Sequence, residues 1–253
     1  MSQTFRQPEI LDIARREGKV SVEQLAAHFD VTLQTIRRDL SELADAGKLE
    51  RVHGGALHPS GTTNIEYEER RTLNEAEKVS IARACVEHIP DGSSLFLNIG
   101  TSTEAVAREL LGHTGLLVVT NNINVANILI ANSDCQIILT GGALRRSDGG
   151  LVGAITIESI RQFKFDVAVI GCSAMDEDGD LLDFDIQEVS VSQTILSRSR
   201  KSFLVADHSK FTRSAPGRIA SLSQIDALFT DQPLPADLAA RCKEWRTEVY
   251  LGG

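Results

Sequence analysis

Small polar residues follow the short apolar runs in the second half of the chain. The segments are NIGTST at 98–103, TNN at 120–122, TGG at 140–142, GCS at 171–173, ADHSK at 206–210 and TD at 230–231. Glycines let a backbone approach a ligand closely, and hydroxyl and amide groups bind oxygen-rich ligands. One such loop is ordinary turn chemistry. A series of them, each after a predicted strand, indicates a binding edge.

The first of these segments has the chemistry that suits an anion. Gly100 permits close backbone approach. Thr101, Ser102 and Thr103 supply hydroxyls, and the helix that follows offers its N-terminal amides. Lys210 can supply the compensating positive charge, although a lysine suits the protein surface equally well. These residues predict a small, oxygen-rich, phosphorylated ligand.

Acidic residues near these loops have two interpretations. Asp183, Asp185 and Glu188 lie before or at the start of a predicted helix, where they either contact the ligand or complement the helix dipole. The sequence leaves that choice open. Asp207 and Asn98 favour structural roles.

A second chemically distinctive set lies near the N-terminus. Thr32 can cap a helix. The apolar stripe of this helix contains Ile36, Leu40 and Leu43. Its outward face carries side chains suited to base edges and phosphates: Gln34, Thr35, Arg37 and Arg38. The pattern predicts a recognition helix for DNA.

Two helices before this segment and a hairpin after it complete the module. Pro8 is expected to open the first helix, which Gly18 ends, and Ser21 caps the second. A hairpin is expected over residues 48–57. Two basic residues lie near its tip, Arg51 and His53. Three helices and a glycine-tipped hairpin within sixty residues predict a winged helix-turn-helix that binds DNA, with a protein-interaction module as the alternative. For His53 a turn role is equally suitable.

The rest of the chain alternates between helical and strand patterns. Helices are expected over 76–89, 103–111, 124–131, 155–163, 187–199 and 236–245. Strands are expected over 94–97, 116–120, 136–140, 167–170, 203–206, 227–229 and 248–251. This alternation predicts an α/β domain with a largely parallel sheet covered by helices. The polar loops described above then lie at the carboxyl ends of its strands, where open α/β sheets bind ligands.

The chain of 253 residues therefore divides into three parts. The DNA-binding module covers 1–58, a linker 59–74 and the α/β domain 75–253. The linker contains Pro59, Gly61 and the charged run EYEERR, without an apolar period. Arg70 and Arg71 in this run either contact DNA or ligand or face solvent, and a solvated face is the preferred interpretation.

Charge and cysteine content limit the remaining possibilities. The net charge is −9, but residues 1–57 carry eight basic and nine acidic residues and are almost neutral, so any DNA-binding surface must be a local basic cluster. No apolar run is long enough to span a membrane and no signal peptide is recognisable, so a cytoplasmic protein is expected. The cysteines form no metal-binding or disulfide pattern and are interpreted as buried thiols: Cys85, Cys135, Cys172 and Cys242.

The run VEQLAAHFDVTLQTIRRDLSELADAGKLERVHGGA resembles the helix-turn-helix of the DeoR family of transcriptional repressors, above all in TIRRDL and RVHGG. This resemblance implies that the DNA contacts are Thr32, Gln34, Thr35, Arg37, Arg38, Arg51 and His53. The part after residue 74 resembles the sensor domain of the same family, whose fold is related to ribose-5-phosphate isomerase. NIGTST matches the family's phosphate loop and ADHSKF its lysine motif. Asn98 departs from the aspartate that the family commonly has.

Two stretches, TNNINVAN and GGALRRSDGGLVG, together with the later DGDLLDFDIQEV, resemble family members that respond to glycerol-3-phosphate. The resemblance therefore implies this effector, with another sugar phosphate as the alternative. It also implies effector contacts at Gly100, Thr101, Ser102, Thr103, Asn121, Asn122, Gly142, Arg145, Ser173, Glu188 and Lys210.

The main rival hypothesis is a sugar-phosphate isomerase fused to a DNA-binding module. Isomerisation needs a general base beside a polarising group. Glu188 could act as a base, but the LLDFDIQEV segment lacks the glycine-rich lysine loop of the isomerases that this domain resembles. No metal site, cofactor site or other catalytic set is recognisable, so we expect a repressor and not an enzyme. We also expect a homo-oligomer, a dimer or tetramer, because one small module offers little contact area for specific operator binding.

Overall fold

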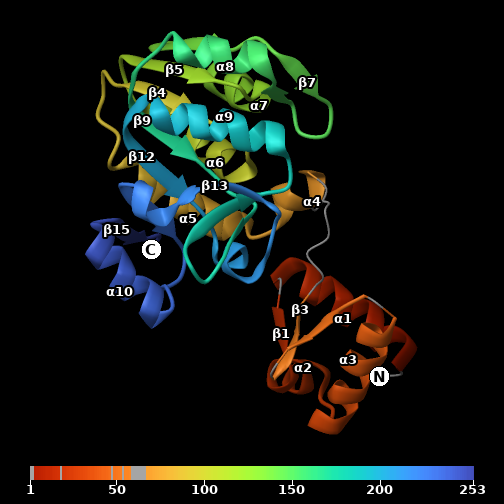
Figure 1. Cartoon of the computed structure of the whole chain (residues 1–253). Coiled ribbons are helices and arrows are strands. Elements are labelled where there is room, and N and C mark those ends of the chain that lie inside the picture. Colours follow the sequence, from red (N-terminus) through yellow and green to blue (C-terminus); the bar gives the residue numbers. More distant parts are fainter. Residues whose placement is uncertain (1–2, 18, 47, 53, 58–66) are drawn as a thin grey trace.

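The computed structural model describes residues 3–17, 19–46, 48–52, 54–57 and 67–253. A small N-terminal domain and a larger α/β domain form separate bodies in Figure 1. In the described part of the chain, no helix combines the length and the apolar character that crossing a membrane requires.

The N-terminal domain packs three helices against a small antiparallel sheet. The helices are α1 (Gln3–Glu17), α2 (Val22–Phe29) and α3 (Leu33–Asp45). The strands are β1 (Lys19–Ser21), β2 (Glu50–Val52) and β3 (Gly55–Leu57), in the order β1-β3-β2. The core includes Ile36, Leu40 and Leu43, the predicted apolar stripe of α3. This arrangement confirms the predicted winged helix-turn-helix.

Two predicted helix caps are present in this domain. The Ser21 hydroxyl accepts a hydrogen bond from the Gln24 amide at 3.1 Å, at the start of α2. The Thr32 hydroxyl accepts one from the Thr35 amide at 3.2 Å, at the start of α3. Each cap satisfies an amide that has no partner within its own helix.

The predicted start of the first helix is wrong. Pro8 lies inside α1, which begins at Gln3. Arg6 forms a buried ion pair with Asp39 of α3, and this contact stabilises the helical turn ahead of the proline. Strand β1 was also not predicted. A Cβ atom on Gly55 would lie 1.9 Å from the Val20 carbonyl oxygen, so only glycine allows β3 to pair so closely with β1.

The α/β domain is built on a parallel sheet with the order β15-β14-β12-β9-β4-β5-β6. Its strands are β4 (Ser94–Leu97), β5 (Leu116–Thr120), β6 (Cys135–Leu139), β9 (Phe165–Ile170), β12 (Ser199–Val205), β14 (Ala227–Thr230) and β15 (Glu248–Leu251). The predicted parallel α/β fold is confirmed. β12 begins four residues earlier than expected, because its polar first residues pair with β9.

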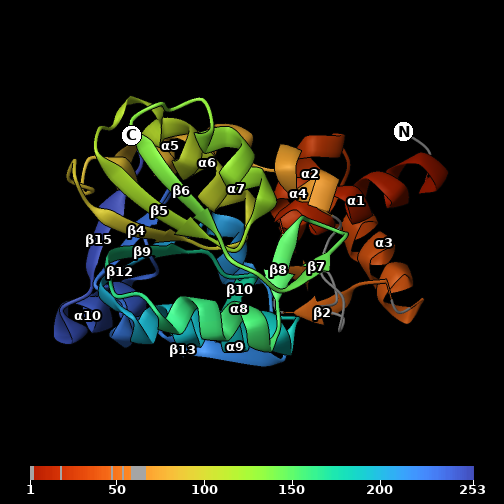
Figure 2. The same cartoon turned by 90° about the horizontal axis from the view of Figure 1, so that it is seen from above.

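Helices cover both faces of this sheet, as Figure 2 shows. One face is covered by α5 (Glu75–Val86), α6 (Thr101–Glu109) and α7 (Ile123–Leu129). The other is covered by α8 (Ala154–Arg161), α9 (Ile186–Ser197) and α10 (Ala236–Trp245). Alternate residues of β4 enter opposite cores, since Leu95 and Leu97 pack with the first set of helices and Phe96 with the second.

Several short elements of the α/β domain were not predicted. They are the hairpin of β7 (Ala143–Arg145) and β8 (Gly150–Val152), the small sheet of β10 (Ala174–Met175), β11 (Asp180–Asp183) and β13 (Gly217–Ser221), and the 3-10 turns η1 (Leu110–Gly112), η2 (His208–Thr212) and η3 (Leu222–Gln224). Each strand is short, and the paired residues of β11 and β13 are 34 to 41 positions apart in the chain. Local periodicity cannot reveal such pairing.

Part of the segment predicted to be a linker is helical. Helix α4 spans Tyr67–Thr72 and is attached to the α/β domain. The Tyr67 hydroxyl donates to the Glu104 carboxylate at 2.9 Å, and the Asn124 amide donates to the Tyr67 oxygen at 2.8 Å. These contacts come from residues distant in the sequence, which explains why the local pattern did not indicate them.

All four cysteines are free. Cys85 and Cys242 are buried as expected. The expectation of burial is wrong for Cys135 and Cys172, which are partly exposed. Cys135 begins the edge strand β6 and Cys172 follows β9 at the carboxyl edge, so neither is covered on all sides.

Candidate functional site

The hydroxyl groups in the loop between β4 and α6 differ in whether they already have hydrogen-bond partners. Gly100 caps α6 with a φ of 146°, a backbone conformation that favours glycine. The Thr103 hydroxyl is turned inward and donates to the carbonyl oxygens of Asn98 and Gly100, each at 2.7 Å. Within the described residues Ser102 makes no side-chain hydrogen bond, and Thr101 lines a pocket. The N-terminal turn of α6 therefore offers amides and the Ser102 hydroxyl to a ligand.

Buried polar atoms without a hydrogen-bond partner gather at the carboxyl edge. Such an atom disfavours folding by about 1–3 kcal/mol. In the described chain they include Asn98 Oδ1, Asn121 Oδ1, Thr140 Oγ1 and Thr230 Oγ1, at the ends of β4, β5, β6 and β14, and Arg70 Nε of α4. A polar ligand at this edge can supply partners, which is what a binding site requires.

One end of this edge is rich in positive charge. Lys210 of η2 is largely buried, and among the described residues its ammonium forms no hydrogen bond or ion pair. Burial lowers the pKa of Lys210, Asp207 opposes this effect, and Arg213 and Arg70 add to it. Asp207 accepts a hydrogen bond from the Asn74 amide at 2.9 Å. Burial opposes ionisation of Asp207, but Lys210, Ser209 and Asn74 together hold its pKa at about 2. Asp207 is therefore a permanent anion.

Lys78 of α5 also belongs to this end and is not among the residues predicted from the sequence. Its side chain is buried, and its ammonium donates to the backbone carbonyls of Arg70 and Leu73. Burial lowers the pKa of Lys78 to about 8, and the nearby Lys210 adds to the effect. The residue lies within an ordinary helical pattern, so no local signal marks it. Lys78, Lys210, Arg70 and Arg213 form a group that we call the cationic end.

The other end of the edge is rich in negative charge and centres on Arg145 of β7. Its guanidinium contacts Asp148 at 2.7 Å, Asp185 at 2.7 Å and Glu188 at 2.6 Å. Asp183 lies beside this group and accepts from the Ser173 hydroxyl at 2.8 Å. Arg145, Asp148, Asp183, Asp185 and Glu188 form what we call the acidic end.

The protonation of Glu188 depends on its surroundings. Burial raises the pKa of Glu188 to about 7, and Asp183 raises it further, whereas Arg145 opposes the shift. Near neutral pH this carboxyl group can therefore donate or accept a hydrogen bond. Asp185 also caps α9 by accepting a hydrogen bond from the Gln187 amide at 2.9 Å. Asp185 therefore has a structural role in addition to its contact with Arg145.

Three other predicted effector contacts have structural partners. The Asn122 side chain caps α7 and donates to Glu104 at 3.2 Å. The Asn121 amide donates to the Leu151 carbonyl at 3.1 Å, which leaves its oxygen without a partner in the described chain. A Cβ on Gly142 would lie 2.0 Å from the Thr156 hydroxyl, so this glycine permits close packing against α8.

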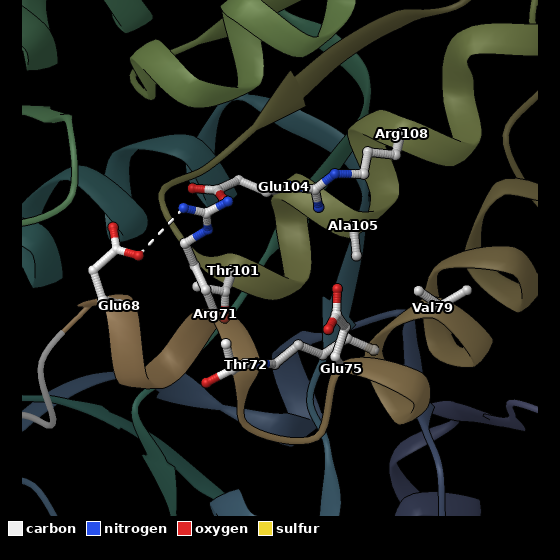
Figure 3. Close-up of a pocket in the computed structure, with 10 residues that line it drawn as sticks. Glu68, Arg71, Thr72, Glu75, Val79, Thr101, Glu104, Ala105 and Arg108 are labelled. Carbon is white, nitrogen blue, oxygen red and sulfur yellow. Dashed lines mark hydrogen bonds and ion pairs between the residues drawn. The ribbon is translucent and has the colours of Figure 1, made fainter.

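A pocket of about 270 Å³ lies between α4, α5 and the start of α6 (Figure 3). Its charged lining residues are Glu68, Arg71, Glu75, Lys78, Glu104 and Arg108. Figure 3 shows Arg71 on the α4 side and Arg108 on the α6 side. Because acidic and basic side chains are equal in number here, this pocket stabilises a bound anion less than the surroundings of Lys210 do.

The outer face of α3 carries most of the predicted DNA contacts. The exposed ones are Thr32, Gln34, Arg37, Arg38 and Arg51, and Thr35 is partly exposed. The Arg51 guanidinium donates to the Arg37 carbonyl at 3.3 Å and so brings the hairpin beside α3. His53 lies outside the described residues. The Thr32 hydroxyl already accepts a hydrogen bond as the cap of α3, so a contact from Thr32 to DNA must use the same hydroxyl group.

Both domains match known protein families. The DeoR-like helix-turn-helix domain matches residues 6–62, and the DeoR C-terminal sensor domain matches residues 73–232. The glycerol-3-phosphate regulon repressor of Escherichia coli is 47% identical over 94% of this chain and 94% of its own length. The repressor of the same name from Haemophilus influenzae is 44% identical over 99% of this chain and 98% of its own length.

Among solved structures, the chain is similar in fold to ribose 5-phosphate isomerase A from Methanocaldococcus jannaschii. The TM-score is 0.41, with 14% identity over 55% of each chain. This likeness concerns the fold alone. The relatives that match nearly the whole chain are repressors by name, so the isomerase hypothesis has no support from them. With both domain models matched and identity above 40% over nearly its full length, the chain belongs to the DeoR family.

Proposed function

We propose that this protein is a transcriptional repressor whose operator binding is weakened by glycerol-3-phosphate. The relatives at 47% and 44% identity carry the name glycerol-3-phosphate regulon repressor. The observation that carries the proposal is the division of the carboxyl edge into a cationic and an acidic end. A phosphomonoester with free hydroxyl groups has matching chemistry, because its phosphate suits the cations and its hydroxyls suit the carboxylates.

On the effector side, the phosphate binds beside Lys210 and the N-terminal turn of α6. The hydroxyls bind towards Glu188 and Arg145. The residues proposed to line the site are Gly100, Thr101, Ser102, Thr103, Asn121, Asn122, Gly142, Arg145, Ser173, Glu188 and Lys210. Of these, Thr103 and Asn122 act mainly by shaping their loops, since their polar groups already have partners.

On the DNA side, the outer face of α3 reads base edges and the hairpin contacts phosphate. The proposed contacts are Thr32, Gln34, Thr35, Arg37, Arg38, Arg51 and His53. We also propose that the DNA-binding domain covers residues 1–58 and the α/β domain covers residues 75–253. A homo-oligomer supplies two or more such surfaces, because one module is too small for tight specific binding.

The proposal is tested with full-length protein and an operator selected from random DNA with that protein. Glycerol-3-phosphate is expected to release the operator, whereas glycerol and inorganic phosphate at equal concentration are not. In a thermal-shift panel, a ligand at a hundred times its Kd should add about 2.7 kcal/mol of stability. Lys210→Met is expected to lose most of this shift, because it removes an ammonium that has no partner among the described residues.

Absence of a shift with every phosphorylated metabolite would contradict the sensor hypothesis. Release of the operator by a different sugar phosphate would retain the sensor and change the effector. Product formation from ribose-5-phosphate would favour the isomerase alternative.

A further inference from the structure

Arg70 is placed differently from Arg71, the other arginine of the charged run. Its side chain is 17% exposed, whereas that of its neighbour Arg71 is 49% exposed. Arg70 therefore faces the α/β domain, contrary to the preferred expectation of a solvated residue. It lies within electrostatic reach of Lys78, Lys210 and Arg213, and so belongs to the cationic end.

The contact that holds Arg70 is weak and easily exchanged. Arg70 Nη2 lies 3.3 Å from Asp148 Oδ2. The same carboxylate accepts two shorter hydrogen bonds from Arg145, with Nε 2.9 Å from Oδ1 and Nη2 2.7 Å from Oδ2. This paired geometry is the stronger arrangement. Asp148 therefore keeps its two hydrogen bonds from Arg145 if Arg70 turns away, and Arg70 Nε is a buried donor that has no partner in the described chain.

The cationic end holds more positive than negative charge. Lys78 and Lys210 share the anion Asp207, Arg70 shares Asp148 with Arg145, and Arg213 lies near both Asp207 and Glu69. Like charges held together at low dielectric repel each other. A phosphate dianion relieves this repulsion and offers oxygen acceptors that match the fork of a guanidinium.

We propose that Arg70 is a further effector-binding residue, which exchanges Asp148 for the phosphate group of the effector. The inference rests on the proposed function. Arg70 belongs to α4, the first described element after residues 58–66, which connect it to the DNA-binding domain. Figure 1 shows α4 at the place where the chain enters the α/β domain. A change of partner at Arg70 therefore acts directly on the segment that carries the DNA-binding domain.

The experiment compares Arg70→Gln with the matched control Arg71→Gln in the full-length protein. The two changes remove the same charge from adjacent positions of one helix. Glycerol-3-phosphate affinity is measured by calorimetry, and the operator Kd is measured with and without this ligand. Arg70→Gln is expected to weaken glycerol-3-phosphate binding at least tenfold and to bring the ratio of the two operator Kd values towards one. Arg71→Gln is expected to leave both quantities within twofold of the wild type.

Arg70→Lys is a second variant that keeps the positive charge but loses the forked geometry of the guanidinium. Its affinity for glycerol-3-phosphate is expected to lie between those of the wild type and Arg70→Gln. Equal effects of Arg70→Gln and Arg71→Gln would overturn the inference in favour of the pocket that Arg71 lines. If Arg70→Gln keeps the wild-type affinity for glycerol-3-phosphate and the wild-type ratio of operator Kd values, the inference is also overturned. The proposed function stands in that case, because the wild-type protein still binds glycerol-3-phosphate. Failure of the wild-type protein to bind any phosphorylated ligand would remove the proposed function itself, and Arg70's role with it.

Discussion

Lys78 changes its charge within a pH range that is accessible to binding assays. Burial lowers its pKa to about 8, and the neighbouring cations contribute, although Asp207 opposes the shift. The ammonium is therefore lost as the pH rises from 7 to 9. A bound phosphate dianion stabilises the ammonium and raises its pKa again, so effector binding and proton uptake are linked.

We expect glycerol-3-phosphate affinity to fall between pH 7 and pH 9, by at most about tenfold per pH unit for each proton taken up. Calorimetry at pH 8 in buffers of different ionisation enthalpy should report net proton uptake on binding. The phosphate itself is almost fully ionised above pH 7, since its second pKa is about 6. Constant affinity without proton uptake would contradict a role for the Lys78 ammonium near the phosphate.

At the scale of elements, a buried ion pair connects α1 to the recognition helix α3. Arg6 Nε lies 2.5 Å from Asp39 Oδ2, and the two side chains are 6% and 1% exposed. Arg6 and Asp39 also border a pocket with Gln34, Thr35 and Arg38, next to the proposed DNA surface. The pair therefore fixes the orientation of that surface from inside the domain.

Asp39→Ala removes this carboxylate and leaves a buried guanidinium without it, which should destabilise the N-terminal domain by about 3–5 kcal/mol. Calorimetry of the full chain should show its unfolding transition at lower temperature, with operator affinity reduced. Effector binding should persist, because the α/β domain has its own cores. The exposed Asp45 at the end of α3 provides the control Asp45→Ala. An unchanged transition in Asp39→Ala would show that Arg6 finds equivalent partners.

At the scale of the whole molecule, the two binding activities must influence each other equally. If the effector weakens operator binding by ten- to a hundredfold, the coupling free energy is about 1.4 to 3 kcal/mol. Saturating operator DNA must then weaken glycerol-3-phosphate binding by the same factor. Calorimetric titration of the protein with bound operator, compared with a non-operator duplex, measures this factor. A glycerol-3-phosphate affinity that the operator leaves unchanged would contradict the proposed coupling.

The strands of the parallel sheet were the most predictable elements. β4, β5 and β15 begin and end at the predicted residues. Strands of a parallel sheet covered by helices on both faces are short apolar runs between turn residues, and that signal is local. The caps at Ser21 and Thr32 are local in the same way, because each involves an amide three residues along the chain.

Elements that depend on distant partners were not predictable. Helix α4 has six residues, too few for stability in isolation. It is held by Tyr67 and Arg70, and the Arg70 partner Asp148 is 78 residues away. The start of α1 before Pro8 was missed for the same reason, since Arg6 pairs with Asp39, 33 residues away. Lys78 was missed because the charged groups around it, Asp207 and Lys210, are far away in the sequence.

The sequence by itself determined that polar loops follow the strands and that one helix face near the N-terminus is basic, because both features arise from short-range patterns. Only the tertiary structure decided how the side chains of those loops are used. It turned Thr103 and Asn122 inward to backbone and side-chain partners, left the Lys210 ammonium without one among the described residues, and brought Arg70 over the same edge. The physical reason is that the direction of a polar side chain follows its hydrogen-bond and charge partners, and here those partners come from other strands and helices.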